Sequence, residues 1–248
     1  MNTNRSRDLL QLIAVMPVAL AHLADFFFFP QRLAGAPFAF ILFDLIGHMT
    51  MPILCLMLAQ GYQNAQNRIR FFFRVLLAAA AAQIPFIWFY GQSWLGGFNM
   101  FFGAAVGLLA LICMDSIGNR ALRAAAIVLL AALTVFCEWP FTAVLWMLLF
   151  HAFRHSSKKQ AVLAAIIFIG QMVTVSWLWS LRMGDSWKNA GLFVVGQTLV
   201  IGAALLIGLY GCIGRHGKHP GYVKWFFCLY YPVHFLMTGM VATVLQLA

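Results

Sequence analysis

The chain has 248 residues, of which 63% are hydrophobic and 9% are charged, and its formal net charge is +10. An ordinary soluble domain has about 45–50% apolar and about 25% charged residues, so this chain has too little polar surface to cover a water-soluble fold. The positive charge does not indicate nucleic-acid binding, because Lys and Arg form no continuous basic stripe and no nucleic-acid motif is present.

Apolar runs long enough to cross about 30 Å of hydrocarbon follow one another along the whole sequence. We predict nine transmembrane helices, at 9–29, 37–62, 71–90, 98–115, 121–137, 139–153, 160–179, 189–210 and 223–247. The run at 139–153 is the shortest and follows Glu138. If this run is one half of a broken hairpin, the chain has eight or ten spans. No low-complexity linker or repeat divides the sequence. We therefore expect one all-α domain over residues 1–248, a polytopic helical bundle in the lipid bilayer.

The distribution of positive charge predicts the orientation of this bundle. With a cytoplasmic N-terminus, 13 of the 16 Lys and Arg residues fall on the cytoplasmic side. Arg32, Arg182 and Lys188 are the three that fall outside. Loops on the cytoplasmic side of a membrane are enriched in Lys and Arg, so the pattern favours a multi-pass protein of the bacterial inner membrane.

The N-terminal segment has a second interpretation. Arg5 and Arg7 precede an apolar run that ends in Ala19-Leu20-Ala21, which resembles a cleavable signal peptide. The aromatic run 26–29 favours an uncleaved first helix, because aromatic side chains gather where a helix meets the membrane interface.

Three histidines are predicted to lie deep in the membrane: His22, His48 and His234. A titratable group in hydrocarbon costs a few kcal/mol, so each is a candidate for function. Asp25 follows His22 by three residues and Asp44 precedes His48 by four, so each carboxylate can reach an imidazole on the same helix face. Such a pair orients a catalytic base. Alternatively, the histidines form hydrogen bonds between helices.

Prolines and amides lie close to these histidines in the sequence. Pro52 and Pro232 each free a backbone carbonyl in a predicted helix, as in broken helices that line cavities. Gln83 and Asn99 flank a short outer loop and supply amide donors suited to a developing oxyanion. The alternative is that both amides cap helix ends.

A basic cluster and a glycine-rich segment are candidates for binding phosphates. Arg68, Arg70 and Arg74 have the spacing of one helix end, and Lys218 follows glycines at 208, 211, 214 and 217. Guanidinium groups bind phosphate oxygens well. The alternative is that these charges only set the topology. The five cysteines lie scattered in apolar segments without CxxC spacing, so we expect packing residues and no metal site.

Four segments together resemble a known family. They are the first span up to Ala21-His22, the segment from Gly47-His48 through Pro52 to Gln60-Gly61-Tyr62, the stretch from Arg74 through Gln83-Ile84-Pro85-Phe86 to Phe98-Asn99 and Gly107, and Tyr231-Pro232-Val233-His234. Their order and spacing are similar to those of the TraX family of membrane proteins, whose founding members N-acetylate the pilin of conjugative pili. The family usually has Asp, Arg and Glu where this chain has Ala21, His48 and Gln60.

The resemblance implies an acetyltransferase that moves acetyl from acetyl-CoA to the N-terminal amine of a pilin or a similar small protein. An N-terminal amine, with a pKa of about 7.7–8.0, is more often neutral at pH 7 than a lysine, and a histidine with a pKa of about 6.5 suits removal of its proton. His22 is then the first candidate for base or transient acetyl acceptor, with Asp25 as its partner; His234 is the second. The phosphates of acetyl-CoA would bind Arg68, Arg70 and Arg74.

Three other functions fit the sequence. A membrane O-acetyltransferase would modify an envelope glycan in place of a peptide amine. A proton-coupled transporter would also place His, Asp and broken helices near the midplane, although no internal repeat is evident. A pilus-assembly chaperone without catalytic activity is the third, favoured by the departures from the family pattern.

Overall fold

The computed structural model describes residues 50–91, 97–156, 158–167 and 221–247, with gaps between these ranges. It also describes a few single positions, which are 18, 19, 22, 47, 93, 169, 170, 173 and 202; between 221 and 247, side chains are described for 229–241, 243 and 244. The elements with defined bounds are α3 (Thr50–Asn64), α4 (Arg68–Tyr90), α5 (Met100–Ser116), α6 (Arg120–Leu133), the short 3-10 helix η2 (Thr134–Phe136), α7 (Thr142–Ala152) and α10 (Gly221–Leu247). The predicted all-α class is confirmed for this part of the chain.

Side-chain caps define where three of the helices begin. Asn67, Asn99 and Asn119 precede α4, α5 and α6, and each accepts a hydrogen bond from a backbone N–H of the first turn. These bonds satisfy N–H groups that lack a partner inside the helix. Helix α4 ends at Gly91, whose φ of 61° is a left-handed conformation that glycine adopts without strain. The observed α4 and α5 agree with the predicted spans 71–90 and 98–115 to within about three residues.

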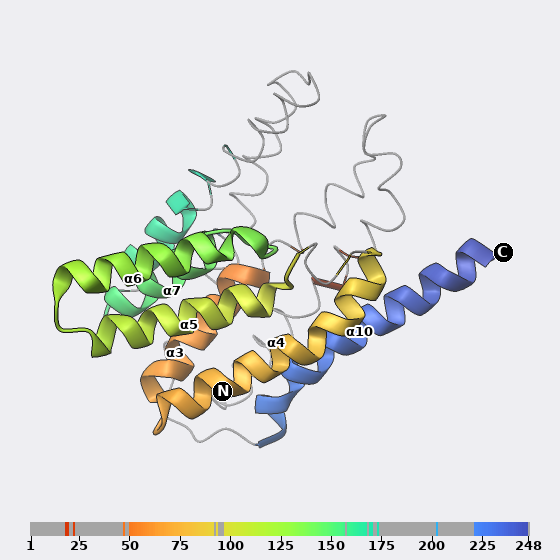
Figure 1. The fold of residues 1–248 in the computed structure, drawn as a ribbon, viewed down its shortest axis with the longest axis horizontal. Coiled ribbons are helices and arrows are strands. Elements are labelled where there is room, and N and C mark those ends of the chain that lie inside the picture. Colours follow the sequence, from red (N-terminus) through yellow and green to blue (C-terminus); the bar gives the residue numbers. More distant parts are fainter. Residues whose placement is uncertain are drawn as a thin grey trace.

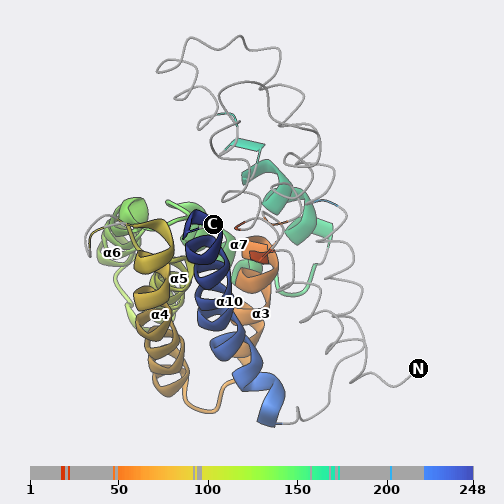
Figure 2. The ribbon, with the colours of Figure 1, turned by 90° about the vertical axis from the view of Figure 1, so that its right-hand side faces the viewer.

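The helices form two neighbouring groups (Figure 1). Helices α3, α5 and α7 pack against one another, and α6 lies along α5. Helix α4 packs on α5 and on the long α10, and the turned view shows α10 running beside α4 (Figure 2). Gly239 allows α10 to approach α4 closely, because a Cβ at this position would lie 2.5 Å from the ring of Trp88.

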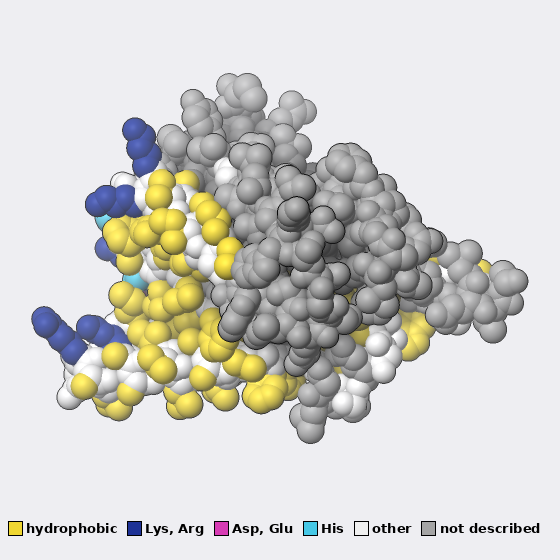
Figure 3. Space-filling view, turned by 90° about the horizontal axis from the view of Figure 1, so that it is seen from above, with side chains coloured by type: hydrophobic (Ala, Val, Ile, Leu, Met, Phe, Trp, Pro, Cys, Tyr) yellow, Lys and Arg dark blue, Asp and Glu magenta, His cyan; other side chains and the backbone are white. Residues whose placement is uncertain are grey.

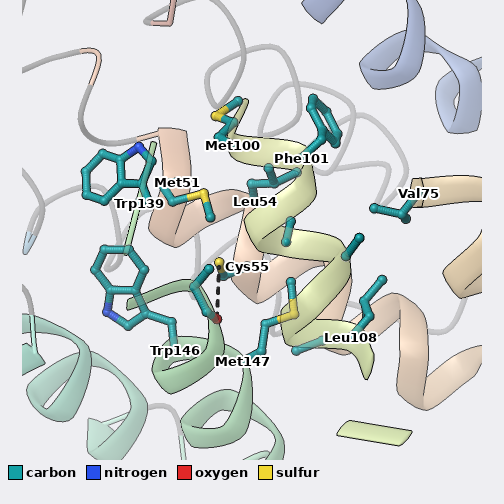
Figure 4. Close-up of a cluster of buried hydrophobic side chains, with 14 of the residues drawn as sticks. Met51, Leu54, Cys55, Val75, Met100, Phe101, Leu108, Trp139, Trp146 and Met147 are labelled. Carbon is teal, nitrogen blue, oxygen red and sulfur yellow. Dashed lines mark hydrogen bonds between the residues drawn. The ribbon is translucent and has the colours of Figure 1, made fainter. Parts of the chain in front are cut away.

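A core of large apolar side chains joins α3, α5 and α7 (Figure 4). Trp146 is fully buried, and its indole N–H donates to the carbonyl of Ala164 at 3.2 Å. Cys55 is also buried and directs its thiol at the carbonyl of Ala143, 3.9 Å away. This agrees with the expectation that Cys55 is a packing residue.

The outward sides of the helices carry apolar side chains. On α4 these are Ile69, Phe73, Leu77, Ile84 and Trp88, spaced so that they share one side of the helix. No residue of α6 is buried, although most of its side chains are apolar. Figure 3 shows apolar side chains along the flank and the Lys and Arg side chains gathered at one end. An apolar surface of this extent is unusual for a monomeric protein in water.

The structure tests the predicted number of spans only in part. Among the described residues, α4 is the one helix that is long and apolar enough to cross a membrane, with 23 residues and a mean hydropathy of 1.7; α5 and α7 are apolar but shorter. The predicted span 139–153 contains α7, whose 11 residues rise about 16 Å. The chain between η2 and α7 is not helical. The Thr134 hydroxyl donates to the carbonyl of Ala131, and Phe141 has a φ of 59°, which lies outside the α-helical region. The total of nine spans stays a prediction.

Candidate functional site

Two histidines from distant parts of the sequence meet in the structure. His22 and His234 are both 4% exposed, and their rings stack with centroids 5.2 Å apart at an interplanar angle of 21°. Helix α10 presents Tyr231, His234, Phe235 and Thr238 on one buried face, at helical spacing. The predicted first and second choices for the base therefore lie in one place.

Aromatic rings surround this pair. Phe235 lies 4.5 Å from the ring of His22, centroid to centroid, and Phe89 and Tyr90 contact His22 edge-on from the last turn of α4. The Nδ1 atom of His22 lies 2.8 Å from the Tyr90 hydroxyl. Water-poor surroundings of this kind strengthen electrostatic interactions between polar groups.

Glu138 completes what we call the histidine cluster, which comprises His22, Tyr90, Glu138, Tyr231 and His234. The Oε2 atom of Glu138 accepts hydrogen bonds from the Tyr231 hydroxyl at 3.0 Å and from the Met100 backbone N–H at 2.9 Å. Its Oε1 atom lies 4.0 Å from Nε2 of His22. The carboxylate thus links α5, α10 and the segment that holds His22.

The backbone around Glu138 is fixed by a short non-helical contact. Phe98 N–H donates to Phe136 O at 2.8 Å, and Glu138 N–H donates to Phe98 O at 2.9 Å. Phe98 and Cys137 form an isolated β-bridge between the two segments. The carboxylate also lies at the N-terminus of α5, where the helix dipole favours negative charge.

Asn99 and Gln83 lie next to the histidine cluster, but their amides are used within the protein. Asn99 caps α5, and its Nδ2 donates to Ala79 O at 2.9 Å and to Gln83 Oε1 at 2.8 Å. Gln83 Nε2 donates to Gly97 O at 2.8 Å. The helix-cap alternative therefore holds for Asn99, whereas Gln83 lies inside α4 and bonds the segment before α5. A role of either amide in holding an oxyanion stays a prediction.

A second polar cluster lies at the opposite end of α4 and α5. Asp115 accepts hydrogen bonds from Tyr62 at 2.9 Å and from Arg68 at 2.7 Å, and His151 Nε2 lies 3.4 Å from its other oxygen. We call these four residues the Asp115 cluster. Arg70 and Arg74 are exposed nearby on α4. Arg68 is thus already paired with a carboxylate, which its sequence context did not predict.

The two predicted catalytic histidines of the histidine cluster therefore lie near the C-terminal end of α4, and the predicted phosphate-binding arginines lie toward its N-terminal end. Arg68 and Tyr90 stand at opposite ends of α4, about 33 Å apart at 1.5 Å per residue. The predicted site residues Asp25, His48 and Lys218 lie outside the described residues, and the pairing of Asp25 with His22 stays a prediction. Among the described residues, no group of three His, Cys, Asp or Glu side chains has the geometry of a metal site.

Six polar residues of the two clusters were not predicted as site residues: Tyr62, Tyr90, Asp115, Glu138, His151 and Tyr231. The chain has six acidic residues, and both of those in the described part, Asp115 and Glu138, lie at a cluster. An acidic side chain among long apolar runs is expected to have a polar partner, because burying an unpaired charge is costly. The small number of acidic residues was therefore the sequence feature that could have indicated a role for Asp115 and Glu138.

Known proteins are similar to this chain over nearly its whole length. A family model described as "TraX protein" matches residues 6–242. A protein of Dichelobacter nodosus, "Probable fimbrial assembly protein FimC, serogroup H1", is 22% identical over 259 residues, with 99% of each chain covered. No solved structure matches significantly.

Proposed function

This chain belongs to the TraX family, as its motifs predicted, and on that premise we propose that it is an integral membrane acetyltransferase. It moves an acetyl group from acetyl-CoA to the N-terminal amine of a pilin or a similar small membrane or secreted protein. The observation that supports this reaction is the histidine cluster, in which a buried imidazole is hydrogen-bonded to a tyrosine and lies beside a carboxylate. Amide formation needs a base for the amine proton, and a neutral imidazole supplies one near pH 7.

His22 is the proposed base or transient acetyl acceptor. It is buried next to Tyr90 of α4, His234 of α10 and Glu138 in the segment before α7, so neighbours from three parts of the chain fix its orientation. His234 is the second candidate, and its Nε2 has no hydrogen-bond partner among the described residues. Because its neighbours hold His22 in one orientation, much of the entropic cost of the reaction is removed.

We propose that the bundle lies in the bacterial inner membrane with its basic end in the cytoplasm. The apolar outer sides of α4, α6 and α10 suit contact with lipid, which is as apolar as these side chains. The basic end carries Arg70, Arg74, Arg120, Arg123, Arg154, Lys158 and Lys159. The positive-inside rule puts such an end on the cytoplasmic side. The histidine cluster then lies toward the outer side.

Topology reporters check this orientation. Fusions after Arg120, Lys159 and Lys218 should read cytoplasmic, and fusions after Gln92 or Ala248 should not, because of the 13-to-3 division of Lys and Arg. A cytoplasmic reading at Ala248 would contradict nine spans and leave eight or ten.

Acetyl-CoA is proposed to enter from the cytoplasm, with its phosphates on the α4 arginines Arg68, Arg70 and Arg74 and its thioester directed along the bundle toward His22. The double variant Arg70→Gln/Arg74→Gln should raise the KM for acetyl-CoA by about 10²-fold or more with little change in kcat, since each of the two lost charge-assisted hydrogen bonds is worth about 1.5–3 kcal/mol. We leave Arg68 out of this variant because it also holds Asp115. The measurement is initial-rate kinetics on purified protein.

Arg120→Gln is the matched control, because Arg120 is exposed at the same end but lies at the start of α6. It should leave KM unchanged. An unchanged KM in the double variant would mean that Arg70 and Arg74 act only as topology signals.

A role in pilus assembly without catalysis is the second candidate, because the Dichelobacter relative is named as a fimbrial assembly protein. Intact-mass measurement of pilins and surface glycans from wild-type and deletion cells separates the possibilities. A pilin lighter by one acetyl group, about 42 Da, in the deletion strain supports the proposed reaction. Unchanged pilin mass with lost pili would favour the assembly role, and a changed glycan would favour O-acetylation.

A further inference from the structure

Glu138 has an arrangement that the proposed base alone does not explain. Two of its hydrogen bonds, from Tyr231 and from the Met100 N–H, converge on Oε2. Both donors lie on rigid helices, so they fix the direction of the whole carboxylate group. The other oxygen, Oε1, is thereby held on the side of His22, at 4.0 Å from Nε2.

The two nitrogens of His22 therefore face different groups. Nε2 is on the Glu138 side, and Nδ1 is 2.8 Å from the Tyr90 hydroxyl. A carboxylate attracts the nitrogen that carries a proton, and a hydroxyl can donate to the one that does not. The tautomer with hydrogen on Nε2 satisfies both neighbours at once.

We infer that Glu138 is a positioning residue for His22: its carboxylate holds the imidazole with the proton on Nε2 and leaves Nδ1 to accept a proton through the hydroxyl of Tyr90. This inference rests on the proposed acetyl transfer and adds a residue to it. A distance of 4.0 Å is too long for a hydrogen bond, so the interaction in the resting protein is electrostatic. It strengthens when His22 becomes an imidazolium.

The proton path balances as follows. The neutral amine nitrogen attacks the thioester carbonyl, and its proton moves to the Tyr90 oxygen while the Tyr90 hydrogen moves to Nδ1 of His22. Breaking the carbon–sulfur bond releases the CoA thiolate, which takes the proton back from the imidazolium. The products are the N-acetylated amine and CoA thiol, and Glu138 remains ionised throughout.

A purely structural role for Glu138 is the competing explanation, because its carboxylate also caps the first turn of α5. Glu138→Gln separates the two roles. The amide oxygen of Gln can still accept from Met100 N–H and from Tyr231, so the cap is kept while the negative charge is lost. Glu138→Asp keeps the charge but shortens the side chain by one methylene group.

The test measures kcat, KM for acetyl-CoA and Tm for the full-length protein in detergent or nanodiscs. We expect Glu138→Gln to lower kcat about 10²-fold with KM within twofold and Tm unchanged, since a lost charge beside a catalytic histidine acts in the transition state. Glu138→Asp should recover part of kcat. Tyr231→Phe, which removes one hydrogen bond and keeps the charge, should lower kcat by less than Glu138→Gln does.

A kcat within twofold of wild type in Glu138→Gln would overturn the inference while leaving acetyl transfer intact. A fall in kcat that is matched by a fall in Tm would also overturn it, in favour of the structural role.

The 15N NMR shifts of His22, assigned by comparison with His22→Gln, provide a readout that needs no acceptor. Wild type should show hydrogen on Nε2, and Glu138→Gln should lose this preference. If wild-type protein turns over no acetyl-CoA but shows this tautomer shift, the proposed function fails and the Glu138 pairing stands. Hydrogen on Nδ1 in the wild type would overturn the pairing.

Discussion

His22→Gln is expected to abolish acetyl transfer while the protein still folds. Glutamine keeps the ability to hydrogen-bond Tyr90, but it cannot take a proton at neutral pH. Loss of a general base typically lowers the rate by about 10²–10⁴-fold. The measurement is acetyl transfer from acetyl-CoA to a pilin N-terminal peptide, with Tm recorded on the same sample. A fall in kcat at constant Tm is the expected result.

Two further histidine variants make this test specific. His155→Gln is the control, because His155 is exposed and its ring nitrogen accepts from the neighbouring Arg154 side chain. It should be fully active. If His22→Gln retains activity within a few-fold and His234→Gln is inactive, the base is His234. If both variants stay active, the mechanism based on buried histidines is wrong.

Trp146→Ala is expected to destabilise the protein by about 3–5 kcal/mol, because it empties a large volume in the core. The Trp146 side chain of α7 is fully buried and packs beside Trp139, with ring centroids 5.8 Å apart, and its loss also leaves the carbonyl of Ala164 without its indole donor. This is a large part of the stability of a typical domain. The expected measurement is a strongly lowered Tm with little folded protein recovered in detergent.

Phe136→Ala is the matched control for that prediction. Phe136 is 61% exposed, so it loses few contacts within the protein. We expect its Tm to change little, by an amount typical of surface substitutions. A similar loss of Tm in both variants would contradict the packing described for the core.

The helical class, the ends of several helices and the family were determined by the sequence itself. Apolar runs of about 20 residues favour helices, because a helix bonds its backbone N–H and C=O groups within the run itself. Asn67, Asn99 and Asn119 are local signals for helix starts, and all three act as caps. The motifs around His22, Gln83 and His234 were sufficient for the family, which the match over residues 6–242 confirms.

The composition of the clusters was decided only by the tertiary structure. Helical spacing predicts contacts three or four residues apart, so the sequence pointed to Asp25 as the partner of His22. In the described residues the carboxylate near His22 is Glu138, more than 100 positions away, and Arg68 is held by Asp115 from the end of α5. Such pairs form because helices that pack side by side bring their ends together. Their register depends on the close packing of side chains such as Trp146, which no local pattern encodes.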